Sequence, residues 1–148
     1  MKIMQINVVY PSGSTGMIVK DIHMQLVDSG NDSIVCYGRG KKLKDRFIYK
    51  LAPESIMKLQ SLHSKLTGYA YAGCFYSTYR LINIIKNQKP DIVHLQCING
   101  YMVNIYKLLE YLKHNDIPTV LTLHAEFMYT AGCGHALECN RWKTGCYH

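Results

Sequence analysis

The sequence predicts a doubly wound α/β domain with a mostly parallel, Rossmann-like sheet. Short β-branched runs alternate along the chain with longer segments in which apolar residues recur every three or four positions, which is the pattern of strands followed by helices. The runs 91–95 (DIVHL) and 119–123 (TVLTL) are typical of strands buried on both faces of a parallel sheet. A glycine-bearing turn follows the first run, as at many strand–helix junctions of this class.

The first two elements are expected at the N-terminus. Lys2–Val9 is rich in β-branched residues and leads into a turn, so it predicts a strand. Ser14 or Thr15 is expected to cap a helix that begins near Gly16 and ends at residues 29–31. The apolar residues that recur along it with helical spacing are Ile18, Ile22 and Leu26.

The remaining elements follow in alternation. Strands are expected over 33–37, 47–51, 91–96 and 118–124, and helices over 53–67, 79–87 and 104–113. The tyrosine-rich stretch 68–80 (GYAYAGCFYSTYR) is expected to pack inward, because large aromatic side chains usually contribute to cores. Strands that alternate with helices place helices on both faces of the sheet.

The bulk composition indicates one domain without a membrane span. The chain has 148 residues, of which 48% are hydrophobic, and contains no run of about 18 apolar residues. Its N-terminus reads as a strand and not as a signal peptide, so we expect a cytoplasmic protein whose six cysteines are thiols, ligands or core residues and not disulfides. The net charge is +7, and the one basic cluster, Arg39–Arg46, reads as a solvated loop. An anionic membrane surface or a phosphate-bearing substrate is the alternative, and no motif predicts nucleic-acid binding.

The turn after the first strand is a candidate phosphate site. Pro11, Gly13 and Gly16 occupy the three glycine positions of the dinucleotide fingerprint G-x-G-x-x-G, so its first glycine is missing. The acid expected after the second strand is also missing, because that strand ends in residues 37–39 (YGR). What remains is a glycine that permits close backbone approach beside helix-start amides, which attract anions. The turn comprises Gly13, Ser14, Thr15 and Gly16.

Polar residues follow two later strands. His124 ends one of them, and Asn99, Gly100 and Tyr101 lie just beyond the other. Because ligands of open α/β sheets bind beyond the carboxyl ends of the strands, these residues are expected to converge with the Gly13 turn. His94, in mid-strand, is expected to be a core group.

A third group of candidates lies near the C-terminus. Cys133, Cys139, Cys146 and His148 are weak candidates for a metal site, with His135 close by, because a tight C-x2-4-C pair is missing. The alternative is an acceptor-binding loop with incidental thiols.

Four segments of the chain resemble the N-terminal half of GT-B glycosyltransferases of family 4, in the bacterial polysaccharide-synthesis branch. They are residues 1–22, 90–105, 117–133 and 139–146. The resemblance implies a retaining transferase that moves a sugar from a nucleotide-sugar to a glycan or lipid-linked acceptor, without a catalytic metal or other cofactor. It places the Gly13–Gly16 turn at the donor diphosphate and acceptor, His124 beside the transferred sugar, and Asn99–Tyr101 in the acceptor cleft.

The resemblance also sets limits. Family members often have His-Asp where this chain has His124, Ala125 and Glu126, so no role is carried over to Glu126. The half that grips the nucleotide-sugar is not in the sequence, so we expect a truncated enzyme that is inactive alone. It is expected in the cytoplasm or peripherally at the inner membrane face. Two alternatives remain open: a stand-alone, non-catalytic phosphate- or nucleotide-binding domain, and a cysteine-ligated metal domain that acts in interactions.

Overall fold

The computed structural model describes residues 1–69, 71–130 and 133–145. The strands are β1 (Lys2–Val9), β2 (Asp32–Arg39), β3 (Ile48–Lys50), β4 (Ile92–Leu95) and β5 (Thr119–Leu121). The helices are α1 (Ser14–Asp28), α2 (Glu54–Thr67), α3 (Phe75–Gln88), α4 (Ile105–His114) and α5 (Phe127–Thr130), followed by a 3-10 turn at Arg141–Lys143. The predicted strands and helices occur in the predicted order, although α3 begins at Phe75 and not near Tyr79.

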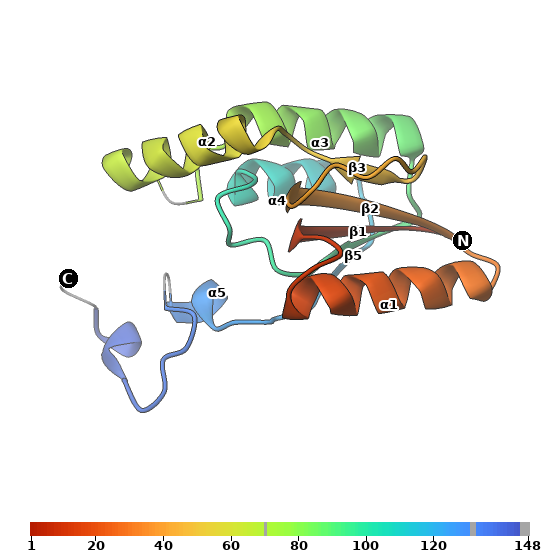
Figure 1. Ribbon diagram of the computed structural model, residues 1–148. Coiled ribbons are helices and arrows are strands. Elements are labelled where there is room, and N and C mark those ends of the chain that lie inside the picture. The colour runs from red at the N-terminus through yellow and green to blue at the C-terminus, as the bar shows by residue number, and fades with distance from the viewer. Residues whose placement is uncertain (70, 131–132, 146–148) are drawn as a thin grey trace.

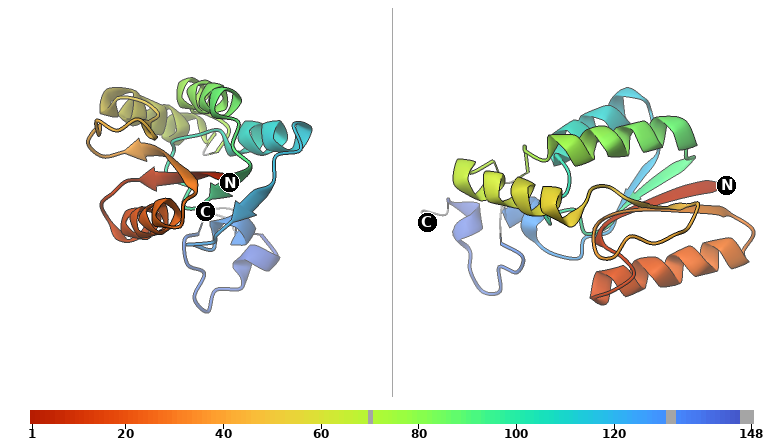
Figure 2. Two further views of the ribbon diagram at one scale, coloured as in Figure 1. Left: turned by 90° about the vertical axis from the view of Figure 1, so that its right-hand side faces the viewer. Right: turned by 45° about the horizontal axis from the view of Figure 1, so that its top comes forward.

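The fold is a parallel sheet between two helical layers, as predicted. The five strands lie in the order β3-β2-β1-β4-β5, and every adjacent pair is parallel. Helix α1 covers one face of the sheet, and α2, α3 and α4 cover the other (Figures 1 and 2). Because all strands run the same way, their carboxyl ends share one edge, and α5 lies beyond that edge (Figure 1).

The alternation of side chains along β1 divides the core into two parts. Met4 and Ile6 belong to the larger cluster, together with Val93 and Leu95 of β4. A smaller cluster contains Tyr10, Val19, Val35 and Tyr37. Since successive side chains of a strand point to opposite faces, Gln5 and Asn7, which alternate with Met4 and Ile6, face α1. Both of these residues, Gln5 and Asn7, are polar and buried.

Strand β5 differs from its prediction as a buried strand. All three of its residues are exposed, as is Leu123 just beyond it. Strand β5 is one of the two edge strands of the sheet, with β3, and pairs only with β4 in the described part of the chain. An apolar sequence run does not reveal which strand lies at the edge.

The prediction that the tyrosine-rich stretch packs inward is met by Tyr71, which is half-buried and packs against the core beside Phe127. It is wrong for the other large residues of the stretch, which are exposed: Tyr69, Phe75, Tyr76 and Tyr79. The buried face of α3 carries Ser77 and Thr78 instead. Thr78 Oγ1 accepts a hydrogen bond from the Asn104 amide at 2.7 Å, and the Ser77 hydroxyl donates to the Met102 carbonyl. The hydroxyls satisfy backbone groups of the loop before α4, which leaves the aromatic side chains on the outer face.

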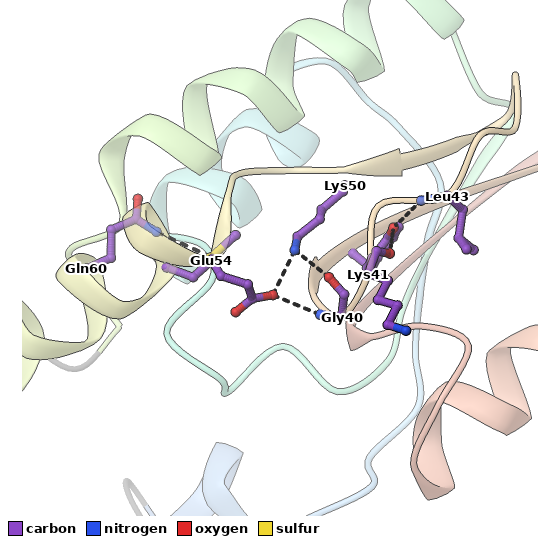
Figure 3. A network of polar contacts seen from close by, with 8 residues as sticks. Gly40, Lys41, Leu43, Lys50, Glu54 and Gln60 are labelled. Atoms are coloured by element: carbon purple, nitrogen blue, oxygen red, sulfur yellow. Dashed lines mark hydrogen bonds and ion pairs between the residues drawn. The ribbon is translucent and has the colours of Figure 1, made fainter.

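The basic loop is anchored at its base. Lys50 forms an ion pair with Glu54 at 2.7 Å and also donates to the carbonyl of Gly40, whose amide donates to Glu54 at 3.0 Å (Figure 3). The Tyr37 hydroxyl donates to the Lys41 carbonyl at 2.7 Å. Four cationic side chains of the cluster Arg39–Arg46 are exposed, in agreement with a solvated loop, whereas Arg39 ends β2 and is half-buried; the four are Lys41, Lys42, Lys44 and Arg46. Within the described residues, no helix has the length and apolar content needed to cross a bilayer.

Candidate functional site

The turn between β1 and α1 is built around Gly13. Gly13 is the N-cap of α1, with φ 75° and ψ 169°, and its carbonyl accepts the first helical hydrogen bond from the Met17 amide at 2.9 Å. The prediction that Ser14 or Thr15 caps the helix is therefore wrong. The Thr15 hydroxyl lies instead 3.3 Å from the Asn7 Nδ2 that donates to it. Because a glycine cap supplies no side-chain oxygen, the first amides of α1 have no acceptor from it and suit an anion.

Gly16 allows α1 to start close against the end of β1. A Cβ at this position would lie 3.3 Å from both the Pro11 carbonyl carbon and the Val9 carbonyl oxygen. That spacing is tighter than ordinary van der Waals contact, and backbone atoms cannot rotate away. Gly16 therefore has the close-packing role of the third glycine in a dinucleotide fingerprint.

Asn7 joins the turn to the end of β4. It is fully buried, and its Nδ2 donates to the Val9 carbonyl at 2.7 Å as well as to Thr15. Its Oδ1 accepts from the Cys97 amide at 2.9 Å. One side chain thus connects the end of β1, the start of α1 and Cys97, the second residue after β4. The sequence shows only a polar residue within an apolar strand, and this was not recognised as a site residue.

A second polar chain links His124 to β1. Gln5 and Gln96, only 0% and 2% exposed, are joined by a 2.7 Å bond from Gln96 Nε2 to Gln5 Oε1. Gln5 Nε2 donates onward to the Val19 carbonyl of α1 at 3.4 Å. His124 Nε2 lies 3.1 Å from Gln96 Oε1. An amide oxygen can only accept, so the proton must reside on His124 Nε2, which leaves Nδ1 of the neutral ring as an acceptor.

His94 lies beside His124 at the same edge. Its Nε2 is 2.8 Å from the Thr122 hydroxyl, and it is half-buried, so the prediction of a wholly core histidine is only partly met. Burial lowers the pKa of His94 below its usual value, and a positive charge on His124 lowers it further.

The lowered pKa of His94 predicts a loss of stability in mild acid. The unfolded chain takes up a proton near the ordinary pKa of 6.5, whereas the folded chain resists it. The stability that neutral His94 contributes to the folded chain is therefore fully present above pH 6.5. It is lost as the pH falls through the lower pKa that His94 has in the folded chain. We expect the free energy of unfolding, measured in urea, to fall between pH 7.5 and pH 5.5.

The free energy of unfolding of the variant His94→Gln is expected to fall less steeply over the same pH range. Some slope will remain, because burial also lowers the pKa of His23. Replacement of the exposed His114 on α4 by glutamine is the matched control. An equal change of slope in both variants would contradict the assignment to His94.

The loop Asn99–Tyr101 is packed against β1 and α3. Asn99 Oδ1 accepts from the Cys97 thiol at 3.0 Å. Tyr101 has a positive φ of 53°, and its carbonyl accepts from the Cys74 thiol at 3.0 Å. A Cβ on Gly100 would lie 2.0 Å from Val8 Cγ2, so only glycine fits there without movement. All three loop residues are half-buried.

The Gly13–Gly16 turn, the Asn99–Tyr101 loop and His124 thus lie at one edge of the sheet, and two separate hydrogen-bond chains tie them to β1. Asn7 connects the Gly13–Gly16 turn to Cys97, and Cys97 contacts Asn99. Gln96 connects His124 to β1. The connecting side chains were missed at the sequence level, because their partners are defined only by the pairing of β1 with β4.

Glu126 has a structural task. Its carboxylate accepts from the Ala136 amide, and its own amide donates to the Gly134 carbonyl at 2.8 Å. The hydrogen bond from Ala136 holds the pKa of Glu126 below its usual range. The carboxylate is therefore used to hold the segment after α5.

The cysteine candidates are only partly described. Cys133 and Cys139 are exposed free thiols that line a small cavity of about 80 Å³ with His135 and Trp142. Cys146 and His148 lie outside the described residues. Within residues 1–69, 71–130 and 133–145, no three His, Cys, Asp or Glu side chains gather as metal ligands.

No family model, curated protein or solved structure matches this chain. The geometry of the strand edge and the resemblance of the sequence motifs therefore carry the functional argument.

Proposed function

We propose that this chain is the acceptor-side half of a family 4-like GT-B glycosyltransferase. The enzyme would transfer a sugar with retention from a nucleotide-sugar to a glycan or lipid-linked acceptor in cell-surface polysaccharide biosynthesis. One observation carries the proposal: a helix start capped only by Gly13 and a histidine with an available ring nitrogen are both tied to β1 at the carboxyl edge of the sheet. That edge is where open α/β sheets bind ligands.

Each group has a role in this proposal. The amides at the Gly13–Gly16 turn face the donor diphosphate, because the start of α1 carries partial positive charge. His124 Nδ1 accepts a hydrogen bond from a hydroxyl of the transferred sugar, with the ring held by Gln96. The Asn99–Tyr101 loop forms a wall of the acceptor cleft. The nucleotide-sugar is a co-substrate, and the proposed chemistry uses no metal or other cofactor.

In this proposal, most of the contacts that bind the nucleotide-sugar come from a second domain, which the resemblance implies. We therefore expect this chain alone to transfer no sugar and to bind the donor weakly. A dissociation constant on the order of 1 mM, about −4 kcal/mol, suits a few exposed hydrogen bonds from helix amides. The proposed place of action is the cytoplasm, where nucleotide-sugars and the cytoplasmic ends of lipid-linked acceptors meet.

A second candidate rests on the turn alone. The Gly13 cap and the packing of Gly16 equally suit a non-catalytic domain that binds a phosphorylated small molecule or a nucleotide. The two candidates differ at His124. A sugar-transferring site predicts that His124 responds to the sugar part of the ligand, whereas a simple anion site does not.

Amide and histidine NMR signals of the labelled chain, titrated with UDP-glucose and with inorganic pyrophosphate, test the proposal. Both probes are expected to shift the amides of the turn, and only UDP-glucose should shift the His124 ring. The variant Ser14→Asp places a carboxylate at the first residue of α1. It should weaken the binding of both probes about tenfold, about 1.4 kcal/mol, through charge repulsion.

The same substitution separates binding from folding. An acid in the first turn should stabilise α1 by about 0.3–1 kcal/mol, so lost binding cannot be ascribed to unfolding. Ser55→Asp at the start of α2 is the matched control and should leave binding unchanged. Shifts confined to other parts of the chain would refute the site, and shifts of the turn without His124 would favour the non-catalytic alternative.

A further inference from the structure

Helix α2 carries an apolar stripe that faces away from the protein. Leu59, Leu62 and Leu66 are 62%, 54% and 78% exposed, and their spacing places them on one side of the helix. The buried residues of α2, Met57 and Ser64, lie on the opposite side. The leucines therefore do not contribute to the core, although their periodicity is that of a core-facing helix.

The start of α3 extends this apolar surface. Phe75, Tyr76 and Tyr79 are 58%, 52% and 69% exposed, while Leu81 and Ile85 face the core. A groove of about 410 Å³ runs between the two helices, and its walls are almost entirely apolar. Residues of both helices line it, among them Ile56, Leu59, Phe75 and Tyr76. We call the six exposed leucines and aromatic residues of α2 and α3 the α2–α3 surface.

The charged side chains of α2 and α3 after Glu54 have one sign. Residues 55–90 include no aspartate or glutamate, whereas Lys58, Lys65 and Arg80 belong to α2 and α3. Lys107 of α4 lies over the ring of Phe75, with its Nζ 5.0 Å from the ring centre. Glu54, at the start of α2, is already held by Lys50. An apolar surface with basic residues at its rim fits a partner that is both hydrophobic and anionic.

We propose that the α2–α3 surface binds the face of an anionic phospholipid bilayer. The leucines insert between the acyl chains, the tyrosine rings lie at the level of the headgroups, and the lysines extend to lipid phosphates. A second copy of the chain is a poorer partner, because each copy would bring the same lysines, while residues 55–90 contain no carboxylate and Glu54 is already paired with Lys50. The proposal is independent of the transferase activity, since a bilayer without acceptor is sufficient for binding.

The position of the surface suits such docking. Helix α2 extends past the carboxyl ends of β1 and β2, at the end of the molecule where α5 also lies (Figures 1 and 2). Helix α1 lies on the other face of the sheet, away from α2 and α3.

Co-sedimentation of the full chain with large unilamellar vesicles tests the proposal. Vesicles of equal parts phosphatidylglycerol and phosphatidylcholine should bind the chain at least about tenfold more tightly than pure phosphatidylcholine. Leu62→Gln/Leu66→Gln should lower the partition coefficient on the mixed vesicles at least about tenfold. Lys58→Gln/Lys65→Gln should also lower it about tenfold, and only on the anionic vesicles.

Two matched controls accompany these variants. Met24→Gln/Val27→Gln removes two equally exposed apolar residues, 51% each, from α1 on the other face of the sheet. Lys42→Gln/Lys44→Gln removes two exposed lysines of the basic loop. Both should bind within about twofold of the parent chain, and circular dichroism should show all variants folded.

Several results would overturn the proposal. These are no binding to the anionic vesicles, equal binding to both vesicle types, or an equal loss in the leucine variant and the Met24/Val27 control. Sedimentation velocity tests the other occupant. A dimer that Leu62→Gln/Leu66→Gln abolishes, without vesicle binding by the parent chain, would assign the surface to a second copy.

Discussion

Gly100→Ala is expected to lower the free energy of unfolding by about 2–3 kcal/mol, near the upper end of the range for overpacked sites. The added Cβ would lie 2.0 Å from Val8 Cγ2 and 3.0 Å from Val8 Cβ. Valine is branched at Cβ and rotates little, and the amide of Val8 is held by the Cys97 carbonyl at 2.7 Å. The loop or the end of β1 must therefore move. Urea denaturation followed by circular dichroism measures the loss.

Two variants identify the cause of that loss. Gly134→Ala is the matched control, because the Cβ it would add meets no heavy atom within 4 Å apart from its own chain neighbours. Its free energy of unfolding should stay within about 0.5 kcal/mol of the parent value. In Val8→Ala/Gly100→Ala the clashing methyl is absent, so the double variant should be more stable than the sum of the two single changes predicts. Additive losses would show that Gly100 and Val8 do not touch.

The architecture could be predicted because it depends on local periodicity. Apolar runs of strand length alternate with helical stripes along the chain, and this order is enough to predict a doubly wound parallel sheet. Periodicity does not say which way a stripe faces. The stripe through Leu62 has helical spacing yet points to solvent, and the run at β5 reads as buried yet forms an edge. Both features depend on long-range packing, which no local pattern contains.

Only those residues of the candidate site that follow the strands could be predicted from the sequence, and not the buried side chains that connect them. The Gly13–Gly16 turn and His124 could be proposed because they stand at strand ends, where ligands bind in this fold class. Gln5 and Asn7 were visible only as polar interruptions of an apolar strand. Their role depends on the pairing of β1 with β4, which places Gln5 beside His94 and brings residues about 90 positions apart into contact. That pairing follows from strand order, and strand order is a property of the whole fold.

Gln96→Leu is expected to lower the free energy of unfolding by about 1–3 kcal/mol, the usual cost of leaving buried polar groups unpaired. The change leaves Gln5 Oε1 without the Gln96 amide and His124 Nε2 without its acceptor. The exposed Gln25 of α1 supplies the matched control, Gln25→Leu, which should change stability by no more than about 0.5 kcal/mol. Urea denaturation again gives the difference.

The double variant Gln5→Leu/Gln96→Leu separates pairing from packing. It removes both members of the buried pair, so it should be more stable than the sum of the single losses by about 1 kcal/mol. Histidine ring nitrogen shifts report the effect at the site. Without Gln96 Oε1, His124 should lose its preference for a proton on Nε2, even in the double variant whose stability partly recovers. If the His124 shifts stay unchanged while stability falls, the glutamine pair supports the core and does not orient the histidine. If both the His124 shifts and the stability change, the buried glutamine pair determines which ring nitrogen of His124 carries the proton, and therefore which nitrogen can accept a hydrogen bond from a ligand.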